Sequence, residues 1–281
     1  MISLLRHGRA RGQVGGGGGG GSGSFANEPA GFTLIEDFDA SQFPVWPAVN
    51  PPFWHDDTGA TAETVSMVVD PTAPMPSGFS DNKYLTMLFD TSLSAGSAPA
   101  SILRYFQTGE FYRKVFVGWW LRHEIGWDNN PPPISNKSGV KLMWLNADTA
   151  DVQFYWGHDG DTMIFNANQQ RSGSPLTGVD RHMTATMNSA ASLLQSRIGS
   201  WVKYELIAGM SSADGVPDGT LDVWIDDVQV MHFTDVAFNG PDSGPRVWSS
   251  FKWNPTFGGG GSPPQHDQYQ SISHIRLSGS N

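Results

Sequence analysis

Aromatic side chains that share one side of an extended stretch with polar side chains are the residues of this sequence best suited to chemistry. Residues an even number apart lie on the same side of a strand, so each pair puts a flat ring near a hydrogen-bonding group. A ring can stack on the C–H face of a sugar while the polar group binds its hydroxyls, so these pairs predict carbohydrate binding. Alternatively, most of these rings fill the core or cover its edges, and one or two are exposed. The pairs are Trp120 with Arg122, Gln153 with Tyr155, and Trp248 with Lys252.

Two oxygen-rich stretches are candidates for a calcium site. They are DNN at 128–130 and HDGD at 158–161, and Asp and Asn oxygens are typical calcium ligands. Tight turns prefer the same residues, so turn formation is the favoured interpretation. We therefore expect no cofactor, with calcium as the one candidate.

Strands must position these residues, because short alternating stretches follow one another from residue 32 onward. Abundant Gly (33) and Pro (19), with only 16% charged residues, favour an all-β, loop-rich protein. The one helical candidate is 182–197, with a loop as the alternative. Strands are predicted at 32–39, 63–69, 83–89, 114–124, 140–146, 151–157, 161–167, 201–210, 219–226, 228–233, 246–253 and 271–279.

The stretch DGTLDVWIDDVQVMHF (218–233) alternates most clearly, with Trp224 among its polar positions. Pairing Ile225 with Val228 leaves residues 226–227, both Asp, as a two-residue hairpin turn. Such turns need residues that tolerate positive φ, and Asp does so less comfortably than Gly. The doubled aspartate is therefore interpreted as a turn rather than as a metal or catalytic site.

The N-terminal region differs in composition from the rest of the chain. Residues 15–24 are almost entirely glycine and serine, which predicts a flexible linker. The preceding 14 residues contain Arg6, Arg9 and Arg11 and no acid. The sequence is therefore divided into an arm and linker at 1–24 and a single domain at 25–281.

Charge and cysteine content exclude several classes of function. The net charge is -10, so an acidic body of this kind would repel nucleic acid. It also disfavours acidic polysaccharides unless a local basic patch overrides the net field. There is no cysteine, hence no disulfide and no thiolate metal site. No apolar run reaches the ~18 residues of a membrane span, and the first residues contain no signal peptide.

Four motifs in order resemble the concanavalin A-like lectins and glucanases, especially their laminin-G-like and polysaccharide-lyase-like variants. The family's hairpin motif has the form G-x-L-x-V-W-V-D-G, and this sequence departs from it at the last position, where Asp227 replaces the glycine. The resemblance spans 34–279 and implies a jelly-roll β-sandwich of two antiparallel sheets, with closing strands from both chain ends. The motifs are LIEDFD at 34–39, VFVGWWLR at 115–122, GTLDVWIDD at 219–227 and ISHIRLSG at 272–279.

The resemblance implies two kinds of catalytic site. Glucanases of this fold carry a strand motif of roughly E-x-D-x-x-E, and its nearest match here, HEIGWD at 123–128, lacks the middle acid. Glu124 and Asp128 would lie roughly 13 Å apart in a strand, whereas retaining hydrolysis needs two carboxylates about 5 Å apart, so glucanase activity is disfavoured. Lyases of this fold use a Tyr or His base, with Arg, Lys or Asn neutralising a uronate. The lyase patterns R-x-E-x-R and Y-x-K-x-G-x-Y are absent, and ordinary strand surface is the favoured interpretation. The lyase candidates are Arg122, His123, Lys141 and Tyr155.

Two functional hypotheses follow. The first is a non-enzymatic virion component of a bacteriophage, such as a capsid decoration or fibre protein. Its basic arm would bind virion or capsid proteins, its sandwich would contact glycans, and it would be part of an oligomer or assembly. It would be located in the virion or outside the cell, without contacts to nucleic acid or membrane. The alternative is a polysaccharide lyase or another carbohydrate-active enzyme.

Overall fold

The computed structural model describes most of the chain from residue 25 onward. Among the described residues there is no helix, and so none long and apolar enough to cross a membrane. The predicted arm at 1–24, the helix candidate at 182–197 and the turn at 128–130 lie outside the described residues. The described ranges are 25–38, 54–56, 65–70, 73–74, 83–94, 96–106, 112–127, 139–147, 152–159, 162–169, 198–213, 216–236, 247–257 and 264–281.

The larger of two antiparallel sheets, sheet A, contains eight strands. Their bounds are Thr33–Phe38 (β1), Val65–Val69 (β3), Lys83–Phe89 (β4), Lys114–His123 (β6), Val202–Gly209 (β10), Gly219–Ile225 (β11), Val228–Val236 (β12) and Gln268–Ser280 (β14). Their order is β12-β11-β10-β6-β14-β4-β3, and β1 pairs with β14 beside this path. The two ends of the described chain therefore meet in one sheet, as the jelly-roll prediction requires.

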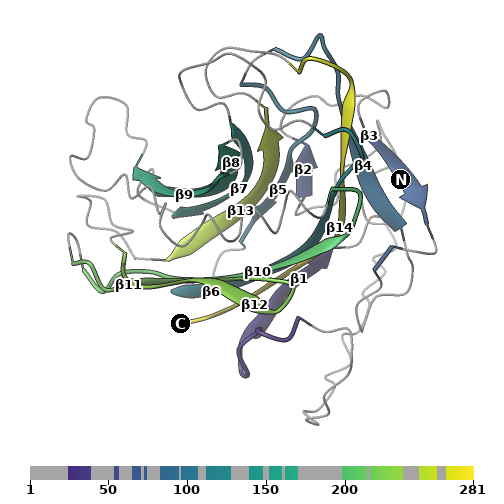
Figure 1. Cartoon of the computed structure of the whole chain (residues 1–281). Helices are drawn as coiled ribbons and strands as arrows, with labels where there is room; N and C mark the ends of the chain where they lie inside the picture. The colour runs from purple at the N-terminus through teal and green to yellow at the C-terminus, as the bar shows by residue number, and fades with distance from the viewer. Residues whose placement is uncertain are drawn as a thin grey trace, which may run out of the picture.

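The second sheet, sheet B, contains six strands. Their bounds are Trp54–Asp56 (β2), Ile102–Tyr105 (β5), Gly139–Ala147 (β7), Val152–Asp159 (β8), Thr162–Gln169 (β9) and Trp248–Thr256 (β13). Their order is β2-β5-β13-β7-β8-β9. Sheet B is stacked on sheet A, and the β14–β4–β3 side of sheet A curves up beside it (Figure 1). The protein is thus an all-β jelly-roll sandwich, which confirms the predicted fold class.

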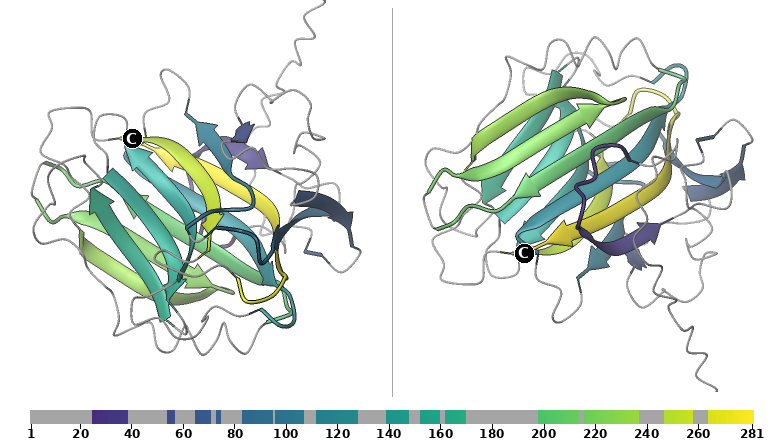
Figure 2. Two further views of the ribbon diagram at one scale, coloured as in Figure 1. Left: turned by 90° about the horizontal axis from the view of Figure 1, so that it is seen from above. Right: turned by 90° about the horizontal axis from the view of Figure 1, so that it is seen from below.

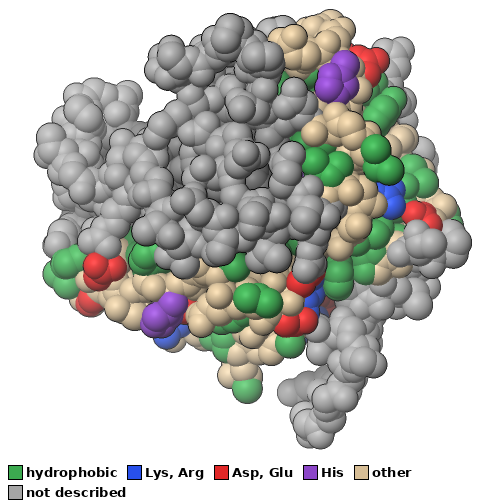
Figure 3. Space-filling view, viewed as in Figure 1, with side chains coloured by type: hydrophobic (Ala, Val, Ile, Leu, Met, Phe, Trp, Pro, Cys, Tyr) green, Lys and Arg blue, Asp and Glu red, His purple; other side chains and the backbone are tan. Residues whose placement is uncertain are grey.

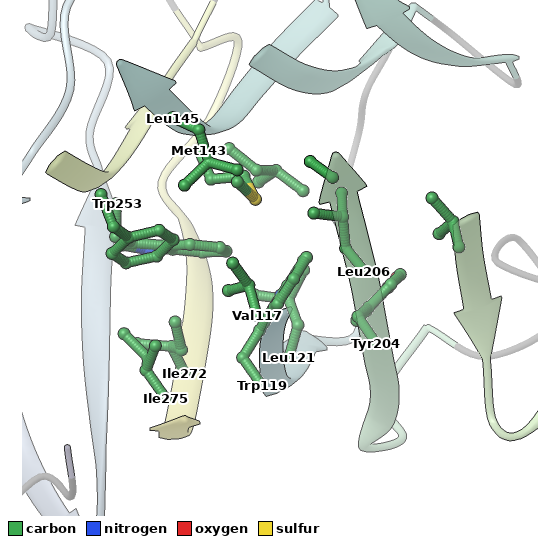
Figure 4. Packing of buried hydrophobic residues seen from close by; sticks show 14 of the residues in the cluster. Val117, Trp119, Leu121, Met143, Leu145, Tyr204, Leu206, Trp253, Ile272 and Ile275 are labelled. Carbon is green, nitrogen blue, oxygen red and sulfur yellow. The ribbon is translucent and has the colours of Figure 1, made fainter. Parts of the chain in front are cut away.

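The core lies between the sheets and is rich in aromatic rings. Every second residue of β6, from Val115 to Leu121, points into it. The Trp119 ring stacks on Tyr204 with 5.4 Å between centroids, and Trp253 of sheet B meets Trp119 edge-on at 5.9 Å (Figure 4). This large buried apolar cluster is what stabilises a chain of this length without disulfides.

The hairpin of β11 and β12 has the predicted turn. Asp226 and Asp227 have φ of 45° and 68°, and Ile225 pairs with Val228. The Asp226 Oδ1 atom accepts a hydrogen bond from the backbone nitrogen of Lys203 at 2.7 Å. The doubled aspartate therefore forms a turn, and its first carboxylate fastens that turn to β10.

Two strands were not predicted from the sequence. β2 has three residues and lies within a proline-rich stretch, and β5 has four. Neither is long enough to show alternation, so pairing with longer partners defines them: β5 pairs with β13, and β2 pairs with β5. Arg104 of β5 is buried with its Nε atom 3.6 Å from a Glu36 carboxylate oxygen of β1. This ion pair links the two sheets.

Residues 25–32 cross the outer face of sheet A, the side turned away from sheet B (Figure 2, right). The buried Phe25 ring packs edge-on against Phe116 of β6, with 5.9 Å between centroids. A Cβ atom on Gly118 would lie 2.5 Å from the Phe25 ring, so only glycine fits there. The backbone nitrogen and side-chain amide of Asn27 donate to the two carboxylate oxygens of Glu205, at 2.9 and 2.8 Å. This segment is therefore docked on the sandwich.

Candidate functional site

The structure distributes the sequence-predicted site residues over three environments. Trp120 and Arg122 lie on the outer face of sheet A, whereas His123 and Trp248 point into the core. Lys141, Gln153, Tyr155 and Lys252 belong to sheet B. The four lyase candidates therefore do not form one site. Arg6, Arg9 and Arg11 lie outside the described residues.

Arg122 is held in a structural clamp on sheet A. Its guanidinium lies 4.9 Å from the Tyr84 ring centroid and 4.8 Å from the Trp201 ring. It donates to Glu124 at 2.9 Å and to the Tyr84 hydroxyl at 2.9 Å, and lies 3.4 Å from Asp70. Burial lowers the pKa of Arg122, but Glu124 and Tyr84 outweigh it and raise that pKa overall. These contacts occupy the guanidinium, so the interpretation of Arg122 as a uronate-binding group is corrected.

Trp120 shares this closed environment. It is half-buried, and its indole nitrogen is buried with no hydrogen-bond partner among the described residues. Its cross-strand neighbours are Lys203 of β10 and Ser273 of β14. Lys203 itself is ion-paired with Asp227 and lies 3.5 Å from Glu205. Arg276 on the same sheet is likewise paired, with Glu28 and Asp37, and in the view of Figure 3 some blue basic side chains lie directly beside red acidic ones. These ion pairs offset the positive charge of Lys203 and Arg276.

His123 and Trp248 are core residues, and their predicted roles are wrong. The side-chain amide of Gln270 lies 2.9 Å from His123 Nε2, and the His123 ring lies 4.6 Å from that of Trp127. His123, Gln270 and Trp127 are all buried, so the imidazole is not available to a polymer on the surface. Trp248 is fully buried, and its indole nitrogen donates to the Ala208 carbonyl oxygen at 3.1 Å. A ring in that position cannot stack on a sugar.

The outer face of sheet B brings several of the remaining candidates into register. Lys252 of β13 is paired with Trp144 of β7, Trp144 with Tyr155 of β8, and Tyr155 with Asn166 of β9. Directly paired residues of antiparallel strands lie on the same face. The flanking residues of Lys252 and Trp144 include Phe251, Trp253, Met143 and Leu145, which are buried in the core. This row of positions therefore belongs to the face turned away from sheet A.

A second row runs beside the first and is rich in amides. Ser250 is paired with Asn146, Asn146 with Gln153, and Gln153 with Asn168. The Asn146 amide nitrogen donates to the Ser250 hydroxyl at 2.9 Å, and this bond orients the Asn146 side chain. The Ser249 hydroxyl donates to the backbone carbonyl oxygen of Asn146 at 3.0 Å. Lys141 lies along β7 beyond a bulge, paired with Gly157 and Thr256.

Sheet B differs from the chain as a whole in its charge. Its six strands contain Arg104, Lys141 and Lys252 against Asp56 and Asp159, plus six Asn or Gln residues. The whole chain has 17 basic and 27 acidic residues. Both acids are the last residues of their strands, so the two rows contain no acid. Arg104 is buried beside Glu36, so the remaining charges of the sheet B strands balance, two lysines against two aspartates, whereas the whole chain is net acidic.

Trp144 and Asn146 were missed as site residues in the sequence. Both lie in VKLMWLN, two positions apart, which is the same aromatic–polar spacing that selected the other pairs. That signal was present, but only the pairing of β7 with β13 and β8 puts these residues between Lys252 and Tyr155. Among the described residues, no group of three His, Asp or Glu side chains could hold a metal ion.

Comparisons with known proteins connect this fold to polysaccharide lyases. No protein-family model and no curated protein sequence matches the chain. Among solved structures, it resembles the alginate lyase vAL-1 from Chlorella virus, with a TM-score of 0.54 and 13% identity over 79% of this chain and 92% of the lyase. It also resembles the endo-β-1,4-glucuronan lyase of the fungus Trichoderma reesei, with a TM-score of 0.55 and 13% identity over 88% of this chain and 96% of that one. At this identity, the likeness establishes a shared fold.

Proposed function

We propose that this protein is a polysaccharide lyase that acts on a uronate-containing polymer at the outer face of sheet B. The observation that carries the proposal is the row of Lys252, Trp144 and Tyr155 beside the amide row of Asn146 and Gln153. The residue types in these two rows include a cation, a phenol, an indole and amides, and no acid. The fold likeness to an alginate lyase and a glucuronan lyase favours this hypothesis over a virion component.

The residues of the two rows fit the steps of β-elimination. Lys252 and the Asn146 amide would neutralise the uronate carboxylate, which makes the C5 proton more acidic. The Tyr155 phenolate would take that proton; its ordinary pKa of about 10 must be lowered by a nearby cation for this role. Breaking the C5–H and C4–O bonds forms a C4=C5 double bond, and the departing C4 oxygen would take the proton from the Tyr155 phenol, which restores the phenolate. Trp144 would support the apolar face of a sugar ring.

The test is direct, because each cleavage creates an unsaturated uronate that absorbs ultraviolet light. The full chain is incubated separately with alginate, glucuronan and a heparin-like polymer, and the rise in absorbance is followed. We expect a rise with at least one polymer, and its loss in Tyr155→Phe. A flat signal with all three polymers would contradict the proposal, as would full activity in Tyr155→Phe.

A further inference from the structure

The outer face of the β11–β12 hairpin carries a tryptophan among polar residues that the proposed lyase site does not use. Trp224 is half-buried on this face, in the same row as Glu205 of β10 and Gln229 of β12. Within the described residues, no hydrogen bond or ring pairing engages the Trp224 side chain. Its apolar neighbours in sequence, Val223 and Ile225, point into the core. The indole is therefore presented on the surface of sheet A.

A hydrogen-bond network lies next to this ring. The Asp222 Oδ1 atom accepts a bond from the Gln229 amide at 3.0 Å and contacts His232 Nδ1 at 2.6 Å. The His232 side chain is 63% exposed and that of Asp222 is 20% exposed. The second carboxylate oxygen of Asp222 has no hydrogen-bond partner in the described part of the chain. The network thus orients the side chains of Asp222, Gln229 and His232, while the second Asp222 oxygen stays available as an acceptor.

A β-bulge brings these side chains together. Gln229 and His232 are three residues apart, so in a regular strand they would lie on opposite faces. The register shifts by one between Val223 and Trp224, and the consecutive residues Val230 and Met231 of β12 are both buried. That extra residue turns Gln229 and His232 to the same face, beside Asp222. Bulges commonly re-aim side chains at functional sites.

We propose that Trp224, Asp222, Gln229 and His232 form a second glycan-binding site, specific for a neutral sugar unit. The indole would stack on the C–H face of the ring, and the Asp222 carboxylate and Gln229 amide would bind adjacent hydroxyls. A carboxylate at the centre of the site, on a chain of net charge -10, excludes uronates by repulsion. The site lies on sheet A and is independent of the proposed lyase face on sheet B.

Native gel electrophoresis in the presence of a neutral polysaccharide tests this site. The full chain is run in separate gels containing glucomannan, mixed-linkage β-glucan or soluble starch, and its mobility is compared with that in a plain gel. We expect retardation by at least one polymer, with the apparent dissociation constant rising about tenfold or more in Trp224→Ala and Asp222→Asn. Val228→Thr, at the exposed end of the same hairpin (57% exposed), should be retarded like the wild type.

Unchanged mobility of the full chain in all three polymers would overturn the proposal. So would equal retardation of Trp224→Ala and Val228→Thr, because the network would then only stabilise the hairpin. Circular dichroism of each variant separates lost binding from lost folding. Lys252→Met, measured in the same gels, should keep the retardation while losing uronate cleavage. The two sites can therefore fail independently.

Discussion

The outer faces of the two sheets use similar residue types in different ways. On sheet A, Arg122, Lys203 and Arg276 each form ion pairs with nearby acids. On sheet B, Lys252 lies in a row with Trp144 and Tyr155, and no acid occurs in that row or in the amide row beside it. The contrast teaches that strand neighbours decide how a cation is used: on sheet A the cations stabilise the fold through ion pairs, whereas strand pairing on sheet B puts a lysine in one row with aromatic residues.

The largest effect on stability should come from Arg122→Met. The substitution removes the cation between two aromatic rings and with it the guanidinium that Asp70 and Glu124 contact. We expect the free energy of unfolding to fall by about 3 kcal/mol, measured by urea denaturation. Lys114→Met, at an exposed lysine of β6 on the same sheet, should cost less than about 0.5 kcal/mol. If folded Arg122→Met lost lyase activity in step with Lys252→Met, the distinction between the two faces would fail.

Lys252→Met tests the other side of the comparison. Removing the cation from the Trp144 row should lower kcat/KM for uronate polymers about a hundredfold, because the carboxylate is no longer neutralised in the transition state. Lys114→Met, an exposed lysine of β6, serves as the matched control and should keep full activity. An equal change in both variants would show that general charge, rather than this row, governs activity.

Asn27→Ala sharpens the account of sheet A through its pH dependence. Burial raises the pKa of Glu205, and the two hydrogen bonds from Asn27 act in the opposite direction. Asn27→Ala removes the side-chain donor and keeps the backbone donor, so the pKa of Glu205 should rise further because the carboxylate has one hydrogen bond fewer. The loss of stability is then present above the wild-type pKa of Glu205 and disappears below it, where both proteins hold a protonated Glu205.

We expect the loss to be about 1–2 kcal/mol at pH 7, from urea denaturation repeated across the pH range. Hydrogen exchange should also increase at residues 25–32, because the segment loses one of its two hydrogen bonds to Glu205 of β10. The neighbouring exposed substitution Ala26→Ser should change neither quantity. A loss in Asn27→Ala that stayed constant with pH would argue against hydrogen bonding to an ionised Glu205.

Asp227→Gly should have the smallest effect. Glycine relieves the positive φ of 68°, while the variant loses an exposed partner of Lys203, which still has Glu205 at 3.5 Å. These changes oppose each other, so the free energy of unfolding should change by less than about 0.5 kcal/mol. Asp226→Gly, which removes the acceptor for the Lys203 backbone nitrogen, should cost about 1 kcal/mol in the same assay. Equal losses would mean that the exposed ion pair contributes more than its environment suggests.

The strands and the hairpin turn could be predicted because their signals are local. All twelve predicted strands occur, and the Asp226–Asp227 turn has the predicted positive φ. β2 and β5 were missed because three or four residues cannot display alternation, and their pairing comes from β13. The site predictions failed for Trp248 and His123 because alternation gives the side of a strand without saying which side meets the second sheet.

The sequence by itself determined that this chain forms an all-β sandwich, because alternating polarity and turn residues act over only a few positions. Only the tertiary structure decided which polar residues lie together. Arg122 of β6 meets Tyr84 of β4 across β14, and also Asp70 at the end of β3, because the strand order of sheet A brings them within reach. Gln229 joins His232 through a single-residue bulge. Strand order and register depend on the packing of the whole core, so no short stretch of sequence contains them.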